Sequence, residues 1–247
     1  MSEVRYGQYC PIAMSAEILC TRWTMPLIRE LLEGSRRFNE LRRGVPRMSP
    51  ALLALRLREL EAVGIVERLP VQGAADLYEY VLTDAGTALG EVVGAFAKWG
   101  QTWLDEHTAL DNASIDHLMW ELRRRANPAE ASRTPAVINF TVNDVGPKSK
   151  PNWWLILERG APGDVCWEDP GREVDLYVKG DLRTLTGVWL GLTTVAEAVA
   201  CGTLEVSGDK ALAGSMPRWL GLSKAAGIAK RGGVRTGGYQ RAAVTGC

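Results

Sequence analysis

Apolar residues in the first 65 positions recur three and four places apart, which is the spacing that puts side chains on one face of an α-helix. Four such stretches are followed by IVERL at 65–69 and LYEYVL at 77–82, whose β-branched and aromatic residues are typical of strands. The sequence between these runs, PVQGAAD, has the proline, glycine and aspartate of a hairpin tip. The pattern predicts two helices, a short helix, a long helix and then a β-hairpin.

The long helix of this series carries the clearest boundary signals. Ser49 is a good N-cap residue, and Pro50 fits the first helical position because proline lacks only an N–H that is unused there. Leu53, Leu57 and Leu60 then share one face. Three helices followed by a hairpin form a winged helix-turn-helix, in which the long helix enters the major groove of DNA.

A further helix is predicted from about Asp84 to Glu106, with Thr83 as its cap. Its apolar residues alternate between the a and d positions of a heptad, the pattern of a helix that pairs with another. The predicted seam consists of Leu89, Val92, Phe96, Trp99 and Trp103. Because a winged helix that reads two half-sites needs a two-fold mate, we expect a homodimer. The alternative is that the stripe packs only within its own domain.

The second half of the chain changes to strand signals. A helix capped by Ser114 comes first, and AVINFTV, NWWLILERG, DVCWED and EVDLYVKG then read as short strands separated by turns. DLRTLTGVWLG and TVAEAVACG read as helices, TLEVSGD as a last strand, and a closing helix follows. The predicted fold class is α+β, with an N-terminal winged helix-turn-helix domain and its dimerisation helix, and a C-terminal antiparallel sheet packed with helices.

Charge is distributed unevenly along the chain. The formal net charge of the 247 residues is zero, but from Arg22 to Arg58 there are nine arginines and three acidic residues, a local net charge of +6. Arginine suits a DNA-binding surface because its planar fork pairs with phosphates or with guanine edges. A solvated helix face is the alternative explanation of such a run.

The DNA-binding surface is expected to include this segment and the wing at 70–77. The predicted DNA-binding residues are Arg36, Arg37, Arg42, Arg43, Arg47, Ser49, Pro50, Ala51, Ala54, Leu55 and Arg58. The outward side of the long helix offers few polar groups beyond Arg58 and Arg56. Sequence readout is therefore expected to be modest at each base and to depend on phosphate positioning and DNA shape.

Several motifs within residues 6–105 occur in the order found in HxlR-type winged-helix regulators. They are Cys10, RWT at 22–24, REL at 29–31, RFNEL at 37–41, LRELE at 57–61 and YVLTDAG at 80–86. The chain resembles that family over this stretch. Its members are dimeric bacterial transcription factors, some of which sense small molecules or oxidants. The resemblance implies a DNA-binding homodimer, and Cys10 matches a position that is a redox-sensing cysteine in some members; a buried, inert thiol is the alternative.

The segments VDLYVKGDLRTLTGVWLG and AVACGTLEVSGD, with the closing helix, resemble the sterol carrier protein type 2 fold over about residues 113–225. That fold has an apolar tunnel between its sheet and its helices for lipids or other hydrophobic molecules. The resemblance implies a hydrophobic-ligand domain, and apolar sites use large aromatic side chains. The predicted ligand-binding residues are Trp153, Trp154, Trp167, Tyr177, Trp189 and Trp219. For each of them the alternative is a place in the core, and Trp153 and Trp154 must point to opposite faces of a strand.

No catalytic or metal-binding set is found in the sequence. The two histidines, His107 and His117, stand in no metal or triad spacing, and no phosphate-binding glycine loop occurs, so we expect no enzyme activity, no cofactor and no metal. Five cysteines at irregular spacing match no disulfide framework. With no membrane-spanning segment and no secretion signal, the expected location is the cytoplasm.

The expected organisation has four parts. A DNA-binding and dimerisation domain occupies 1–106, a linker 107–113, a sterol-carrier-like ligand domain 114–228 and a flexible basic tail 229–247. The interpretation is a homodimeric bacterial transcriptional regulator that senses a hydrophobic small molecule, with double-stranded DNA, a second copy and that effector as partners. Two alternatives stay open: a thiol-based redox regulator, and a protein that sequesters hydrophobic ligands.

Overall fold

The structure is a computed structural model that describes residues 6–74, 77–104, 110–147 and 149–231. The chain divides into two compact units, Met1–Phe96 and Ala97–Cys247. The predicted linker and tail lie partly outside the described residues. Within the described part, no helix combines the length and the apolar character that crossing a bilayer requires.

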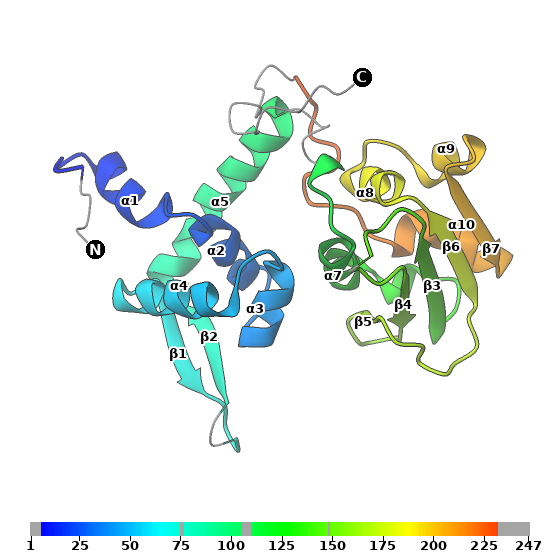
Figure 1. Cartoon of the computed structure of the whole chain (residues 1–247), viewed down its shortest axis with the longest axis horizontal. Helices are drawn as coiled ribbons and strands as arrows, with labels where there is room; N and C mark the ends of the chain where they lie inside the picture. Colours follow the sequence, from blue (N-terminus) through cyan, green and yellow to red (C-terminus); the bar gives the residue numbers. More distant parts are fainter. Residues whose placement is uncertain (1–5, 75–76, 105–109, 148, 232–247) are drawn as a thin grey trace. The chain divides into compact units, whose positions relative to one another are not determined.

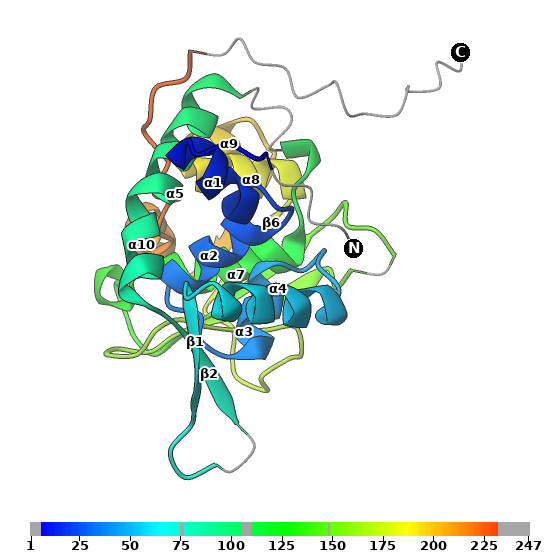
Figure 2. The same ribbon diagram turned by 90° about the vertical axis from the view of Figure 1, so that its left-hand side faces the viewer.

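The first unit contains the predicted series of helices and the hairpin (Figure 1). Its elements are α1 (Pro11–Leu19), α2 (Thr24–Leu32), α3 (Phe38–Gly44), α4 (Pro50–Ala62), β1 (Val66–Pro70), β2 (Tyr78–Leu82) and the first part of α5 (Asp84–Trp103). The strands β1 and β2 pair antiparallel. Figure 2 shows the hairpin projecting beyond α3 and α4, as the wing of a winged helix does.

The core of the first unit lies between α2, α3, α4 and the hairpin. Its fully buried members are Leu27, Ile28, Leu41, Leu53 and Leu57. The start of α5 is fixed to this core by Thr83, whose hydroxyl accepts a hydrogen bond of 3.1 Å from the N–H of Gly86 and donates one of 2.7 Å to the carbonyl oxygen of Gly64. The predicted cap of this helix is thereby confirmed.

The second unit contains a five-stranded sheet and its helices. Its elements are the end of α5, α7 (Ile115–Arg125), the 3₁₀ helix η1 (Pro128–Glu130), β3 (Ala136–Val142), β4 (Asn152–Leu157), β5 (Asp164–Cys166), β6 (Leu176–Gly180), α8 (Leu182–Leu190), α9 (Val195–Ala200), β7 (Leu204–Gly208) and α10 (Lys210–Trp219). The strand order is β5-β4-β3-β6-β7.

The expectation of a purely antiparallel sheet is wrong. The strands β3, β4 and β5 form an antiparallel meander, but β6 pairs with β3 in parallel, with Ile138 opposite Leu176. After β5 the chain crosses back and joins the sheet on the other side of β3. Turn signals show where a strand ends but not which edge the next strand joins, so the sequence pattern could not reveal this crossover.

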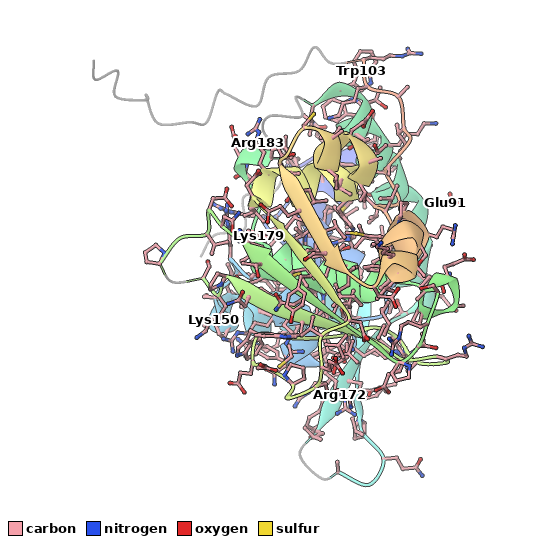
Figure 3. All side chains as sticks on the ribbon, turned by 90° about the vertical axis from the view of Figure 1, so that its right-hand side faces the viewer. Glu91, Trp103, Lys150, Arg172, Lys179 and Arg183 are labelled. Carbon is pink, nitrogen blue, oxygen red and sulfur yellow. The ribbon has the colours of Figure 1, made fainter. Side chains whose placement is uncertain are left out.

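The sheet has one face in the core and one that is partly exposed. The pairing places Phe140, Trp153 and Val178 on the inner face, and all three are buried. Trp154 and Tyr177 lie on the outer face, on either side of β3. Figure 3 looks onto this outer face, where Lys179 of β6 is exposed.

Candidate DNA-binding surface

One face of helix α4 is buried in the core and the opposite face is exposed to solvent. Leu53 and Leu57 are 0% exposed and Leu60 is 2% exposed. The hydroxyl of Ser49 accepts a hydrogen bond of 3.3 Å from the N–H of Leu52, which confirms the predicted start of this helix. Among the predicted DNA-binding residues from Ser49 to Arg58, Ala54 is half-buried and the others are exposed. The exposed residues are Ser49, Pro50, Ala51, Leu55 and Arg58.

Arginines gather at both ends of α3 and in the turn that precedes α4. They are Arg36, Arg37, Arg42, Arg43 and Arg47, and all of them are exposed. The carboxylate of Glu40 accepts hydrogen bonds from the backbone N–H groups of Arg36 and Arg37, at 2.9 and 3.0 Å. A carboxylate that binds these N–H groups satisfies donors that a helix start otherwise leaves unpaired. The fold therefore holds the backbone of these two arginines in place.

Three of these arginines have no acidic partner in the described part of the chain. They are Arg36, Arg42 and Arg58, whose guanidinium groups make no ion pair there. In contrast, Nε of Arg37 lies 3.6 Å from Oε1 of Glu79 in the hairpin, which makes an ion pair. Positive charge that is not neutralised inside the protein is what a polyanion such as DNA attracts.

Arg56 differs from the prediction made for it. Its guanidinium forms an ion pair with Glu59, and its Nε donates a hydrogen bond of 3.3 Å to the carbonyl oxygen of Arg22. A side chain held at two points does not reach a base edge without breaking these contacts. Arg58 is therefore the one exposed arginine on α4.

A buried carboxylate connects the elements behind this surface, and the sequence analysis missed it. Glu30 of α2 is 0% exposed, and its carboxylate accepts hydrogen bonds of 2.9 Å from Arg29 and 3.3 Å from the hydroxyl of Ser35. It also touches Gly44 at the end of α3, where an added Cβ would overlap the carboxylate. Only glycine allows this close approach of α3 to α2. No local signal marks Glu30, because charged residues on amphipathic helices are normally exposed.

The hairpin is attached to the same surface. The N–H of Tyr80 donates a hydrogen bond of 2.8 Å to the carbonyl oxygen of Arg36. The guanidinium of Arg68 lies 3.7 Å from the ring centre of Tyr78, a cation–π contact that orients an exposed arginine on the wing. Residues 75 and 76 of the predicted wing lie outside the described residues. Arg68 is a second residue that the sequence analysis missed, although it stands in the strand next to the hairpin tip.

The seam predicted on α5 is exposed in the single chain. Phe96 is 60% exposed, Trp99 51% and Val92 37%, while Leu89 and Trp103 are half-buried. In this helix of 20 residues only Gly86 is buried. An isolated helix with so little burial gains little stability from its own chain.

An apolar groove lies beside the seam within the first unit. Its volume is about 750 Å³, and it is lined by α1, the start of α2 and the α5 residues Leu89, Val92 and Phe96. The helix α1 has no buried residue, and its Ile12 is 80% exposed. A continuous exposed apolar surface of this kind is typical of an interface.

The six aromatic residues predicted to bind ligand differ in their burial. Trp153 and Trp219 are buried in the core, Trp154 and Trp189 are half-buried, and Trp167 and Tyr177 are exposed. The indole Nε1 of Trp219 donates a hydrogen bond of 2.9 Å to the carbonyl oxygen of Leu212. Trp153 and Trp167 form an edge-to-face pair with ring centres 6.0 Å apart.

The two N-terminal cysteines flank α1. Cys10 is half-buried at its start and Cys20 is exposed at its end, where it lines the groove. The helix between them separates their Cα atoms by about 15 Å, far beyond the roughly 7 Å that a disulfide allows. Within one chain, α1 would have to unfold before they could pair. A redox role for Cys10 stays a prediction.

Known proteins resemble the first unit. The model of the HxlR-like helix-turn-helix family matches residues 18–108. The HTH-type transcriptional regulator YvaP of Bacillus subtilis is 37% identical over 100 residues, which are 40% of this chain and 93% of that protein. The chain belongs to the HxlR-like helix-turn-helix family. The family match includes α2, α3, α4, the hairpin and α5, which are the elements that carry the arginines and the seam.

Two further relatives of this HxlR-like chain match a similar share of it. The HTH-type transcriptional regulator Rv3095 of Mycobacterium tuberculosis is 36% identical over 38% of this chain and 58% of its own length. The solved structure of the reduced form of the transcriptional regulator YodB from B. subtilis is 37% identical, covers 38% of this chain and 93% of that chain, and gives a TM-score of 0.35.

Proposed function

We propose that this HxlR-like chain is a DNA-binding transcriptional regulator that acts as a homodimer. The observation that carries the proposal is the set of arginines that have no acidic partner among the residues the structure describes: Arg36 before α3, Arg42 within it and Arg58 on α4. They come from consecutive elements of one helix-turn-helix. The relatives named above, which are described as HTH-type transcriptional regulators, support the same function.

The arginines have different roles in this proposal. Arg36 precedes the helix that crosses the DNA backbone in this fold and Arg42 lies within that helix, so both are assigned to phosphates. Arg58 lies on the helix that enters the major groove, where its fork fits a guanine edge. The neighbouring outward residues Ala51 and Leu55 are apolar and suit thymine methyl groups.

The dimer is assigned to the seam of α5 and the groove next to it. Phe96 and Trp99 expose more than half of their surface, and α1 adds Ile12. A second copy related by a two-fold axis would bury these side chains against one another. It would also supply two recognition helices for two half-sites, as a palindromic operator requires.

We further propose that the second unit is a sterol-carrier-like domain that senses a hydrophobic molecule. Two donors of α8 support a ligand here: the hydroxyl of Thr186 and the indole Nε1 of Trp189 are buried and have no hydrogen-bond partner among the described residues. They stand three residues apart, on one side of the helix. Buried donors are normally satisfied, and an oxygen atom of a bound molecule would satisfy them. The expected effector is therefore hydrophobic with an oxygen acceptor.

Fluorescence anisotropy with a labelled duplex from the promoter region of its own gene tests DNA binding. We expect Arg42→Ala to weaken binding about tenfold at low salt, because a dimer loses two phosphate contacts. Arg172→Ala is the matched control: this arginine of the second unit is also exposed, and it pairs with Glu158 at 3.0 Å. Absence of wild-type binding, or equal effects of the two variants, would contradict the proposal.

A titration with cis-parinaric acid, a fatty acid that fluoresces in apolar surroundings, tests the sensing function separately. Trp189→Phe keeps an aromatic side chain but removes the N–H, so the affinity should fall about fivefold, as expected for one lost hydrogen bond. Trp167→Phe, at an exposed position, is the control and should bind like the wild type. If the wild type does not bind the probe, or if both variants bind it equally well, the proposed site is wrong.

A further inference from the structure

The last turn of α5 receives its hydrogen-bond donors from a distant part of the chain. Helix ends leave carbonyl groups unpaired, and cationic side chains stabilise them. The last turn of α5 has no basic residue of its own. Instead, the N–H of Arg231 donates a hydrogen bond of 2.8 Å to the carbonyl oxygen of Thr102, and Nζ of Lys230 donates one of 3.1 Å to that of Leu104.

Arg231 also brings positive charge to a predicted seam residue. The guanidinium of Arg231 lies 6.0 Å from the ring centre of Trp103. Lys230 and Arg231 belong to the segment for which the sequence predicts a flexible tail, yet both are fixed to a helix end. Each of these contacts spans more than 120 positions of sequence.

The segment that ends in these residues begins on the helices that pack on the sheet. We call residues 221–231 the strap; Figure 1 shows it in orange after α10. The N–H of Ser223 donates a hydrogen bond of 2.9 Å to the carbonyl oxygen of Trp189, the residue next to the end of α8. A Cβ on Gly191 would lie 2.9 Å from the Cβ of Ala226, so the strap lies directly on the end of α8.

The first residue of the strap is equally close-packed. Gly221 has a positive φ of 66°, and a Cβ there would overlap the carbonyl oxygen of Arg125 at the end of α7. The helices α7 and α8 contribute Leu122, Leu185 and Val188 to the core under the sheet. The strap is thus anchored to α7 and α8 at one end and to α5 at the other.

We propose that the strap couples the packing of α8 on the sheet to the end of α5. A shift of α8 on the sheet moves the backbone of Trp189 and Gly191. The strap transfers this shift to Lys230 and Arg231, which donate hydrogen bonds to the carbonyl groups of Leu104 and Thr102. The stability of the last turn of α5 then depends on how α8 packs on the sheet. The proposal rests on the proposed role of α5 as the dimer helix and gives the effector a route to it.

Hydrogen–deuterium exchange of the full chain tests the capping contact. Arg231→Pro removes the N–H that binds Thr102, and exchange within residues 100–104 should become about fivefold faster, as expected for one hydrogen bond. Arg231→Ala keeps that N–H and should cause a smaller change. A chain that ends at Ile228 should show an increase of about tenfold, whereas a chain that ends at Arg231 should match the wild type.

A pair of glycine variants tests the coupling itself. Gly191 and Gly202 have similar positive φ values, 73° and 71°, so alanine causes similar backbone strain at both. Only at Gly191 would the added Cβ press on the strap, since Gly202 has nothing within 4 Å. Gly191→Ala should therefore accelerate exchange at 100–104 severalfold, and Gly202→Ala should leave it unchanged.

Exchange within β3 serves as the folding control for every variant. If β3 keeps its protection and neither Arg231→Pro nor Gly191→Ala alters residues 100–104, the strap is not a coupling element. If one variant loses the protection of β3, the comparison of the other variant with the wild-type chain decides whether the strap is a coupling element. The exchange measurement needs neither DNA nor a second copy. The coupling role of the strap can therefore be refuted while duplex binding is confirmed, and it can be confirmed while duplex binding is refuted.

Discussion

The dimer seam gives the sharpest quantitative prediction. Phe96 exposes 60% of its surface in the single chain. An aromatic side chain has roughly 200 Å² to bury, so full burial against a partner removes about 120 Å² from water. At about 25 cal/mol per Å² this is about 3 kcal/mol for each copy. Because a two-fold interface contains the residue twice and alanine keeps the Cβ, Phe96→Ala should weaken the dimer by about 5 kcal/mol.

Sedimentation equilibrium over a wide concentration range measures this effect. A loss of about 5 kcal/mol raises the dimer dissociation constant more than about a thousandfold. Leu69→Ala is the control, because Leu69 is 45% exposed in the same unit but lies on the wing. A monomeric wild type, or a dissociation constant for Phe96→Ala within about threefold of the wild type, would refute the assignment of the seam.

Three other predictions concern single positions. Gly44→Ala should lower the free energy of unfolding by about 3 kcal/mol, since its Cβ would overlap a buried carboxylate, whereas Gly94→Ala in α5 has nothing within 4 Å and should raise it by about 1 kcal/mol; thermal denaturation compares them, and equal effects would contradict the close contact. The backbone N–H and the hydroxyl of Thr194 lower the pKa of Glu197, so this carboxylate stabilises the fold above its ordinary pKa and the contribution is lost as the pH falls through the lowered pKa. Thr194→Val should bring this pKa back toward its ordinary value in an NMR titration, and an unchanged pKa would exclude the hydroxyl as a cause. Arg58→Ala should relax discrimination at one base pair per half-site by about 1–3 kcal/mol in operator competition, and an equal loss on every sequence would assign Arg58 to a phosphate.

Local signals were sufficient for the helices and the hairpin of the first unit. Ser49 and Pro50 mark the start of α4, and its leucines at helical spacing mark the buried face. Thr83 likewise caps α5. These features depend on neighbours within a few residues, so the sequence pattern contains them.

Features that depend on distant contacts could not be predicted. The parallel pairing of β6 with β3 depends on which sheet edge the chain joins. The contact of Glu30 with Gly44 depends on how closely α2 and α3 pack, and that of Arg231 with α5 joins residues more than 120 positions apart. Within the candidate site, exposure of the predicted arginines follows from amphipathic spacing, but the pairing of Arg56 with Glu59 and the carbonyl of Arg22 requires the folded structure.

The salt dependence of duplex binding by the full chain tests the central claim most directly. A dimer that places Arg36 and Arg42 of each copy on phosphates makes at least four such contacts. The logarithm of the affinity should then fall with the logarithm of salt concentration with a slope of about −3.6 or steeper, with two chains per duplex. A slope near zero, or one of about −1.8 with a single chain bound, would contradict the account.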